Sequence, residues 1–160
     1  MTTTSTREAE IIVDPDVPLV RIIREFDAPV AKVFRAHVDP DLFAQWNGPD
    51  DLETRFISFD CRTGGAYRYE MGRGDETYGF YGSFHEVRTD ELIVQTFCFD
   101  GMPDAVALEK LVFEDLGDGR TRLTGTSLVD DFAGRDAFVA SGMETGVQEG
   151  YRKLDALLAG

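Results

Sequence analysis

The chain has 160 residues and a formal net charge of −14, from 30 acidic against 16 basic residues. This length suits one domain with a single core, and a hydrophobic content of 42% is ample to fill that core. Nucleic acids and anionic membranes are bound by clustered Lys and Arg, so the acidic surface disfavours both as partners.

Residues 1–10 are polar and Thr-rich, and they contain no apolar stretch of the kind found in a signal peptide. We expect them to form a disordered leader ahead of a single domain over residues 11–160. No segment approaches the roughly 18 consecutive apolar residues of a membrane span. Cys61 and Cys98 lie in β-rich runs, which favours two reduced, half-buried thiols. Together these features predict a cytoplasmic protein.

The first elements are a strand and two short helices. Apolar and polar residues alternate over 19–26, as in a strand with one buried face. Pro29 is typical of the first turn of a helix. A second short helix begins at Asp39-Pro40, with Asp39 as its N-cap, and carries Trp46 near its end.

The rest of the chain predicts six strands and one long helix. The strands are expected over 52–60, 66–71, 78–87, 92–99, 108–116 and 120–129, and the helix over 134–158. Short links between successive strands force antiparallel neighbours. The sequence therefore predicts an α+β fold, with a curved antiparallel sheet around a long C-terminal helix and two short helices after the first strand.

The glycines within the predicted long helix are relevant to whether free space lies between that helix and the sheet. Gly142, Gly146 and Gly150 recur every four residues, although each interior Gly costs a helix about 0.8–1 kcal/mol relative to Ala. Close helix–sheet packing and room left for a ligand both explain this spacing. Gly82 and Gly125 interrupt strands, which is typical of bends or bulges in a curling sheet.

Aromatic residues occupy alternate strand positions and would share the concave face of such a sheet. An ordinary core has the same pattern, so the pattern alone leaves both a filled core and an aromatic-lined groove open. The residues concerned are Tyr67, Tyr69, Tyr78, Phe80, Phe84, Phe97 and Phe99.

Short motifs along residues 10–159 occur in an order that resembles a known family. They are Arg24-Glu25-Phe26-Asp27-Ala28-Pro29, Gln45-Trp46-Asn47-Gly48-Pro49, Gly64-Gly65-Ala66-Tyr67-Arg68-Tyr69, Gly82-Ser83-Phe84-His85-Glu86-Val87, Thr121-Arg122-Leu123-Thr124 and Gly142-Met143-Glu144-Thr145-Gly146. In these motifs the chain resembles the START/Bet v 1-like (SRPBCC) superfamily with its helix-grip fold. Within that superfamily it is similar to the bacterial single-domain proteins of the Activator of Hsp90 ATPase homologue-like family.

The resemblance implies a hydrophobic cavity, used across the superfamily for lipids, sterols, polyketides and other apolar molecules. It implies no single reaction. We do not expect the co-chaperone role behind the family name to carry over, because these 160 residues leave no room for the companion N-terminal domain. Asn47 and Val147 stand where the family usually has bulky aromatic residues. Both smaller residues suggest a ligand of different size or shape.

The sequence has few residues in patterns typical of a catalytic site. The two histidines, His37 and His85, fall on separate elements, and no metal-binding or nucleophile motif is present, so we expect no metal and no cofactor. Glu86 and Glu109 lie within strands, where a buried acid can act as a general base. For both, we favour a charge on the solvated face of the sheet.

The leading hypothesis is a binding module for a small apolar, aromatic or lipid-like molecule, more plausibly without catalysis. Arg68 or Gln95 would fix the orientation of the ligand. A cyclase-type or hydrolase-type enzyme in the same cavity stays open, as do a protein-interaction or chaperone-binding module and a homodimer. The expected ligand-binding residues are Trp46, Tyr67, Tyr69, Phe80, Phe84, Gln95, Phe97, Met143, Val147 and Tyr151.

Overall fold

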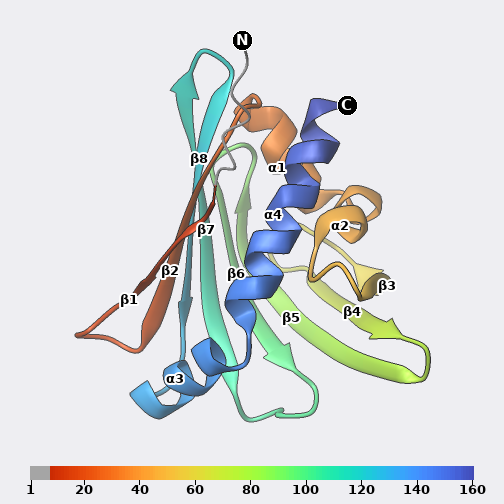
Figure 1. Ribbon diagram of the computed structural model, residues 1–160, viewed down its shortest axis with the longest axis vertical. Coiled ribbons are helices and arrows are strands. Elements are labelled where there is room, and N and C mark those ends of the chain that lie inside the picture. The colour runs from red at the N-terminus through yellow and green to blue at the C-terminus, as the bar shows by residue number, and fades with distance from the viewer. Residues whose placement is uncertain (1–7) are drawn as a thin grey trace.

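The computed structural model describes residues 8–160 as a sheet wrapped around a helix (Figure 1). The strands are β1 (Glu10–Val13), β2 (Leu19–Phe26), β3 (Glu53–Phe59), β4 (Ala66–Arg73), β5 (Glu76–Arg88), β6 (Leu92–Phe99), β7 (Val106–Gly117) and β8 (Arg120–Leu128). The helices are α1 (Val30–Val38), α2 (Pro40–Trp46), α3 (Phe132–Ala140) and α4 (Met143–Ala159).

The eight strands form one antiparallel sheet in the order β1-β2-β8-β7-β6-β5-β4-β3. The sheet curves, and α4 lies across its concave side (Figure 1). This confirms the predicted α+β helix-grip architecture. None of the helices in residues 8–160 is both long and apolar enough to cross a membrane.

The first residues that the structure describes are hydrogen-bonded to the last helix. The backbone N–H of Ala9 donates to Gln148 Oε1 (2.8 Å), and Gln148 Nε2 donates to the carbonyl oxygen of Ala9 (2.9 Å). Ala9 is buried, and the following residues form β1, which pairs with β2. Strand β1 was not predicted from the sequence. Because β1 precedes β2, α1 and α2 follow the second strand of the chain and not the first. Residues 1–7 of the expected leader lie outside the described residues.

The long helix expected over 134–158 is two helices, so that prediction was wrong in its detail. The break lies at Ser141 and Gly142, and Gly142 has a φ of 88°, in the left-handed region that favours glycine. Asp131 begins the separate α3 by accepting a hydrogen bond from the N–H of Gly134 (2.7 Å). Gly142 therefore separates α3 from α4 instead of lying inside one continuous helix.

Gly82 and Gly125 were expected to mark bends or bulges, and neither lies at a register shift, so the bulge alternative was wrong. The register shifts lie between Phe56 and Ser58, between Phe84 and Glu86, and between Asp115 and Gly117. Gly82 instead permits close approach: a Cβ there would lie 2.0 Å from the carbonyl oxygen of Thr96 on β6. No side chain larger than hydrogen fits that position.

The hydrophobic core fills the space beneath the C-terminal half of α4. Leu154 of α4 is fully buried against the sheet and α1, in one cluster with Phe26, Val33 and Leu123. Toward the other end of α4, Met143 and Val147 are only half-buried. The core thus occupies one end of the concave face, and the side chains under the start of α4 do not fill the other end.

Candidate functional site

A pocket of about 1180 Å³ lies between the concave face of the sheet, the start of α4, α3 and the α2–β3 link. Its volume exceeds the roughly 300–1,000 Å³ usual for small-molecule sites. All ten residues expected to bind a ligand line this pocket. Of these, Trp46, Tyr67, Tyr69 and Phe84 are buried and also belong to the core, whereas the other six are half-buried.

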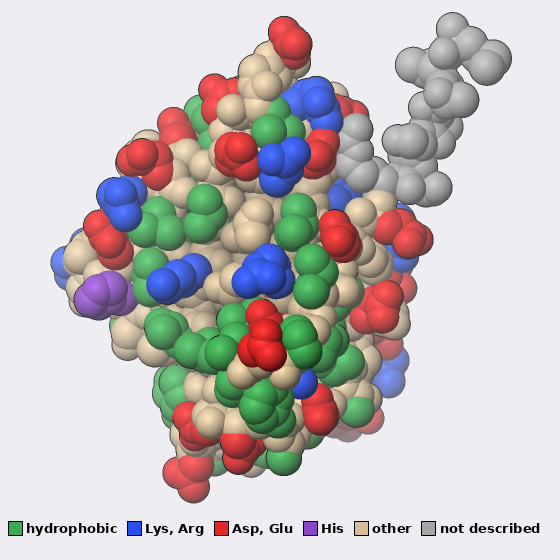
Figure 2. All heavy atoms as spheres, turned by 90° about the vertical axis from the view of Figure 1, so that its left-hand side faces the viewer, with side chains coloured by type: hydrophobic (Ala, Val, Ile, Leu, Met, Phe, Trp, Pro, Cys, Tyr) green, Lys and Arg blue, Asp and Glu red, His purple; other side chains and the backbone are tan. Residues whose placement is uncertain are grey.

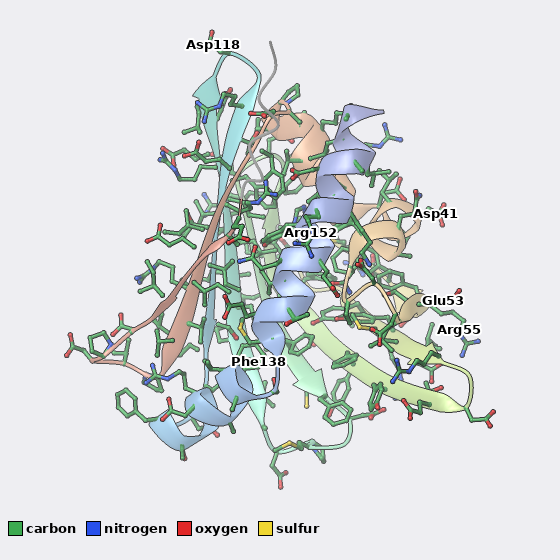
Figure 3. All side chains as sticks on the ribbon, viewed as in Figure 1. Asp41, Glu53, Arg55, Asp118, Phe138 and Arg152 are labelled. Carbon is green, nitrogen blue, oxygen red and sulfur yellow. The ribbon has the colours of Figure 1, made fainter. Side chains whose placement is uncertain are left out.

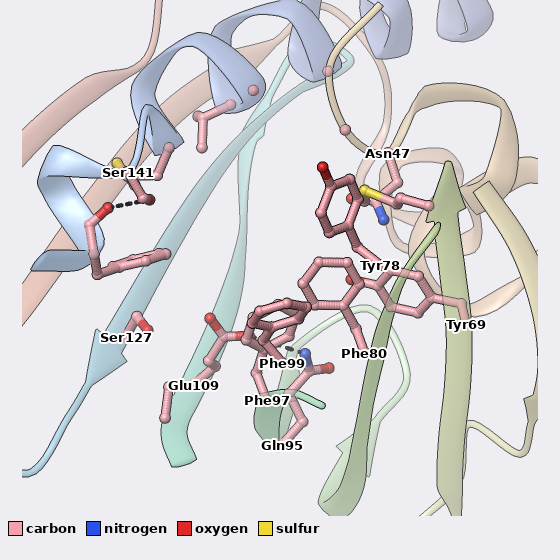
Figure 4. Close-up of a pocket in the computed structure, with 18 of the residues that line it drawn as sticks. Asn47, Tyr69, Tyr78, Phe80, Gln95, Phe97, Phe99, Glu109, Ser127 and Ser141 are labelled. Carbon is pink, nitrogen blue, oxygen red and sulfur yellow. Dashed lines mark hydrogen bonds between the residues drawn. The ribbon is translucent and has the colours of Figure 1, made fainter. Parts of the chain in front are cut away.

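One wall of the pocket is a row of stacked rings across three neighbouring strands (Figure 4). Tyr67 and Tyr69 of β4 have ring centroids 6.0 Å apart and an interplanar angle of 16°. Tyr69 stacks on Phe80 of β5 (5.3 Å, 28°), and Phe80 stacks on Phe97 of β6 (5.4 Å, 22°). Alternation along each strand brings these rings to one face, and together they form a flat aromatic surface.

The opposite wall comes from α4 and the end of α2. Trp46 and Tyr151 stack with ring centroids 6.0 Å apart. The indole Nε1–H of Trp46 donates to the carbonyl oxygen of Ala36 (2.9 Å), which fixes the ring. Met143 and Val147 continue this wall toward the start of α4. Both walls are therefore held by their own packing before any ligand arrives.

Gly142, Gly146 and Gly150 all line the pocket, but each has its own environment. A Cβ on Gly150 would lie 3.1 Å from the carbonyl oxygen of Trp46, so this glycine allows close packing of α4 on α2. A Cβ on Gly146 would meet only Pro49, at 3.7 Å, and one on Gly142 would meet nothing within 4 Å. Of the three glycines, close packing explains only Gly150. The element packed against Gly150 is the end of α2, whereas the sheet was expected there.

A carboxyl group, that of Glu109 on β7, lies in the wall of this apolar pocket (Figure 4). Gln95 Nε2 on β6 donates to Glu109 Oε1 (3.1 Å). Burial raises the pKa of Glu109, while hydrogen bonds from the Gln95 and Ser127 side chains act in the opposite direction. The pocket therefore holds one desolvated acid with two polar neighbours.

The expectation that Glu109 is solvated was wrong. Along β7, Ala107, Glu109, Leu111 and Phe113 alternate with exposed residues and so share the concave face. The alternation along β7 could have indicated that Glu109 faces the concave side. The prediction instead followed the charge of the side chain, which favours an exposed position.

The comparisons with known proteins agree with this geometry. A model of the Activator of Hsp90 ATPase homolog 1-like protein family matches residues 27–159. The chain belongs to this family. No functionally curated protein matches it.

Solved structures of bacterial members share the fold along nearly the whole chain. Protein Ms6760 from Mycobacterium smegmatis is 25% identical, with a TM-score of 0.84 over 93% of this chain and 95% of that one. A protein from Arthrobacter aurescens is 25% identical, with a TM-score of 0.85 over 94% and 91% of the two chains. Protein CV1439 from Chromobacterium violaceum is 27% identical, with a TM-score of 0.76 over 88% and 96%. The chain is similar to these proteins across a single shared domain.

Asn47 and Val147, which were expected to affect the size or shape of the ligand, both line the pocket. Asn47 lies beside Tyr69, whose pKa is raised by burial and lowered in part by the Asn47 side chain. The Asn47 Nδ2 atom is buried and makes no hydrogen bond of good geometry with any described residue. A ligand oxygen would satisfy it.

Three other polar predictions have clear outcomes. Arg68 was expected to orient the ligand, but it lies outside the pocket, donates to Asp100 (2.8 Å) and stacks over Tyr81, so this prediction was wrong. His85 is exposed, as expected from its phase with Phe84. Glu86 pairs with Arg88 on the exposed face, also as expected.

The remaining titratable groups bear on whether the site could hold a metal, and His37 is the nearest candidate for other chemistry in the wall. No group of three or more His, Cys, Asp or Glu side chains in residues 8–160 is arranged to hold a metal ion. His37 lines the pocket, but its Nδ1 hydrogen-bonds to the carbonyl oxygen of Val33 (2.8 Å), and burial lowers its pKa to about 4. His37 is therefore a neutral ring in the wall.

Proposed function

We propose that this chain binds a small, largely apolar molecule in the pocket between α4 and the sheet. Family and fold support a ligand-binding or interaction module in general. The observation that carries the finer proposal is the row of stacked rings from Tyr67 to Phe97 beside the Glu109–Gln95 pair, facing about 1180 Å³ of space. An apolar wall with few polar groups is the usual composition of a small-molecule site.

The physical basis of the affinity would be apolar burial against preformed walls. Removing apolar surface from water contributes about 25 cal/mol per Å². The rings of Tyr69 and Trp46 are already held by neighbouring rings, so a ligand loses little free energy to ordering the site. The flat faces of Phe80 and Phe97 favour a planar or ring-containing ligand.

A pocket-filling variant tests the proposal. Val147→Trp places a large ring in the space beside α4, whereas Arg152→Trp adds the same ring at an exposed position of the same helix (Figure 3). We expect Val147→Trp to weaken binding of flavonoid, polyketide-like and lipid probes by about tenfold or more, because the ring excludes them from the site. Arg152→Trp should leave binding unchanged. Native mass spectrometry and thermal-shift titration give the readouts.

Equal binding by both tryptophan variants would contradict a ligand site in this pocket. So would a library in which no compound shifts the melting temperature of the parent protein.

A second candidate function is an acid–base enzyme in the same pocket, and Glu109 is the observation that favours it. A carboxyl with a raised pKa can act as a general base or acid once a substrate lies beside it. Mass spectrometry of each bound probe after incubation tests this. A change in probe mass that Glu109→Gln abolishes would support an enzyme, and unchanged probes would support binding alone.

An interaction module has weaker support from the surface. Exposed apolar side chains on the outer side include Val13, Leu108, Val112 and Leu128. Figure 2 shows hydrophobic side chains on this side of the molecule interspersed with Lys, Arg, Asp and Glu. Such mixing is unlike the contiguous apolar patch of a protein-docking surface.

A further inference from the structure

The charges around the pocket all have one sign. Glu109 lies in the wall, and Asp104, Asp130 and Asp131 line the end formed by the β6–β7 link and the start of α3. Among the described residues that line the pocket there is no lysine or arginine. The whole chain has a formal net charge of −14, so the field at the pocket is that of an acidic protein.

Two arginines make contacts outside the pocket lining. Arg68 donates to Asp100. Arg24 has its guanidinium 6.0 Å from the ring of Tyr151 and pairs with Asp155. The groups that shift the pKa of Glu109 are its burial and the side chains of Gln95 and Ser127. The only described hydrogen-bond partners of this carboxyl are neutral, namely the side chains of Gln95 and Ser127.

The aromatic wall is also suited to positive charge. Tyr69, Phe80 and Phe97 present ring faces along one row, and the face of an aromatic ring carries partial negative charge. A cation within about 6 Å of such a ring is attracted to it, and more strongly where water is excluded. The Glu109 carboxyl lies in the same wall, one strand beyond Gln95 and Phe97.

We propose that the ligand of this pocket carries a protonated amine on an aromatic or apolar body, with Glu109 as the counter-ion of the amine. This inference rests on the proposed binding function and names the class of ligand. The flat aromatic part of the ligand stacks on the rings of Tyr69, Phe80 and Phe97. Its ammonium group donates hydrogen bonds to the carboxylate oxygens of Glu109. Ligands with a carboxylate, such as fatty acids, are disfavoured because they would meet four acidic side chains and no basic one.

Binding of an amine has a proton signature that binding of a neutral molecule lacks. Burial raises the pKa of Glu109, and an ammonium in hydrogen-bond contact lowers it again. An amine therefore displaces a proton from the fraction of Glu109 that is protonated in the empty pocket. A neutral alcohol leaves that proton in place.

The other titratable groups that face Glu109 do not produce this signal. Burial raises the pKa of Tyr67 and Tyr69 on β4, and it raises that of Tyr151 on α4 to about 12, so all three stay neutral at pH 7. Gln95 and Ser127 do not titrate. His37 in the wall has a pKa of about 4 and is already neutral.

The test uses three probes with one ring system: anthracenylmethylamine, anthracenylmethanol and anthracene carboxylate. Each is titrated by isothermal calorimetry at pH 7 into the parent protein, Glu109→Gln and Glu86→Gln. Glu86→Gln removes the same charge from the exposed face, away from the pocket. Titrations in two buffers of different ionisation enthalpy measure the proton released.

We expect the parent protein to bind the amine about tenfold or more tightly than the alcohol and the carboxylate to bind weakest, with proton release, where it occurs, confined to the amine. Glu109→Gln should remove the preference for the amine over the alcohol and any proton release. Glu86→Gln should behave as the parent protein does.

Equal binding of amine and alcohol, or tighter binding of the carboxylate, would overturn the amine assignment while leaving the pocket function standing. An amine preference that survives in Glu109→Gln would overturn the role of Glu109. Failure of all three probes to bind would overturn both the inference and the proposed function. The parent protein alone decides the first and last outcomes, so they do not depend on the variant folding.

Discussion

Arg24 of β2 and Asp155 of α4 form a two-pronged ion pair, with Arg24 Nη1 3.0 Å from Asp155 Oδ1 and Nη2 2.5 Å from Oδ2. The arginine side chain is 1% exposed and also lies over the ring of Phe26. This pair fastens the C-terminal half of α4 to the sheet. Within residues 8–160, no ion pair joins the N-terminal half of α4 to the sheet, and this half borders the pocket.

Breaking this pair should destabilise the fold. We expect Asp155→Asn to lower the free energy of unfolding by about 1–3 kcal/mol, because it removes the carboxylate charge paired with the buried guanidinium. Asp155 is itself 42% exposed, so solvent screening keeps the effect below that of a fully buried pair. Urea denaturation measures it. Glu53→Gln on exposed β3 is the matched control, and an equal loss there would contradict the assignment (Figure 3).

His37 should make stability depend on pH. Its pKa is about 4 in the folded protein against 6.5 in a model peptide, because burial disfavours the charged ring. Between these values the unfolded chain binds a proton that the folded chain does not, so stability rises with pH through this window. The contribution, about 3 kcal/mol, is complete above pH 6.5 and is lost as the pH falls toward 4.

Denaturation curves from pH 4 to 7 test this expectation. His37→Phe should flatten the slope, and His85→Gln, at an exposed position, should keep it. An unchanged slope in His37→Phe would assign the effect to other groups.

Glu109 should show the opposite sign. Its folded-state pKa is raised by burial, so between the unfolded and folded values the folded chain holds the extra proton. Stability therefore falls as the pH rises through that window, and the ionised carboxyl is a cost at higher pH. We expect Glu109→Gln to melt at a higher temperature than the parent protein at pH 8 and at nearly the same temperature at pH 4. A variant that is less stable at pH 8 would show that the carboxylate stabilises the fold.

The two glycines at the start of α4 should respond in opposite directions to alanine. Gly142 has a φ of 88°, and Gly142→Ala should cost about 1 kcal/mol because an L-residue is strained there. Gly146 lies inside the helix, where a Cβ would meet only Pro49 at 3.7 Å, so Gly146→Ala should gain about 0.5–1 kcal/mol. Thermal unfolding of both variants checks the signs. Two changes of the same sign would contradict the helix break.

The sequence predicts the elements well because alternation along strands is strong and turn residues separate them. Of the predicted strands, 92–99 agrees with β6 in full. The Arg68 prediction failed although the same alternation was available, because Arg68 lies between Tyr67 and Tyr69 and must face outward when they face inward. Glu109 was missed for the same reason. In both cases residue type was given more weight than phase.

Other features depend on contacts that no local pattern contains. The pairing of Ala9 with Gln148 joins residues 139 positions apart. The break at Gly142 depends on a left-handed backbone, whereas Gly146, four residues on, stays helical. Spacing alone treats these two glycines alike. The volume of the pocket beneath α4 likewise depends on the distance between the helix and the sheet, which no local sequence pattern contains.

Trp46 is the single tryptophan of the chain, and it stacks on Tyr151 in the wall of the pocket. Indole emission responds to the polarity and mobility of its surroundings. All tryptophan fluorescence of this protein therefore originates from one ring at the candidate site, with no signal from elsewhere to dilute it. The molecule contains its own optical reporter of what enters the pocket, and the unlabelled chain suffices for screening compounds by their effect on that emission.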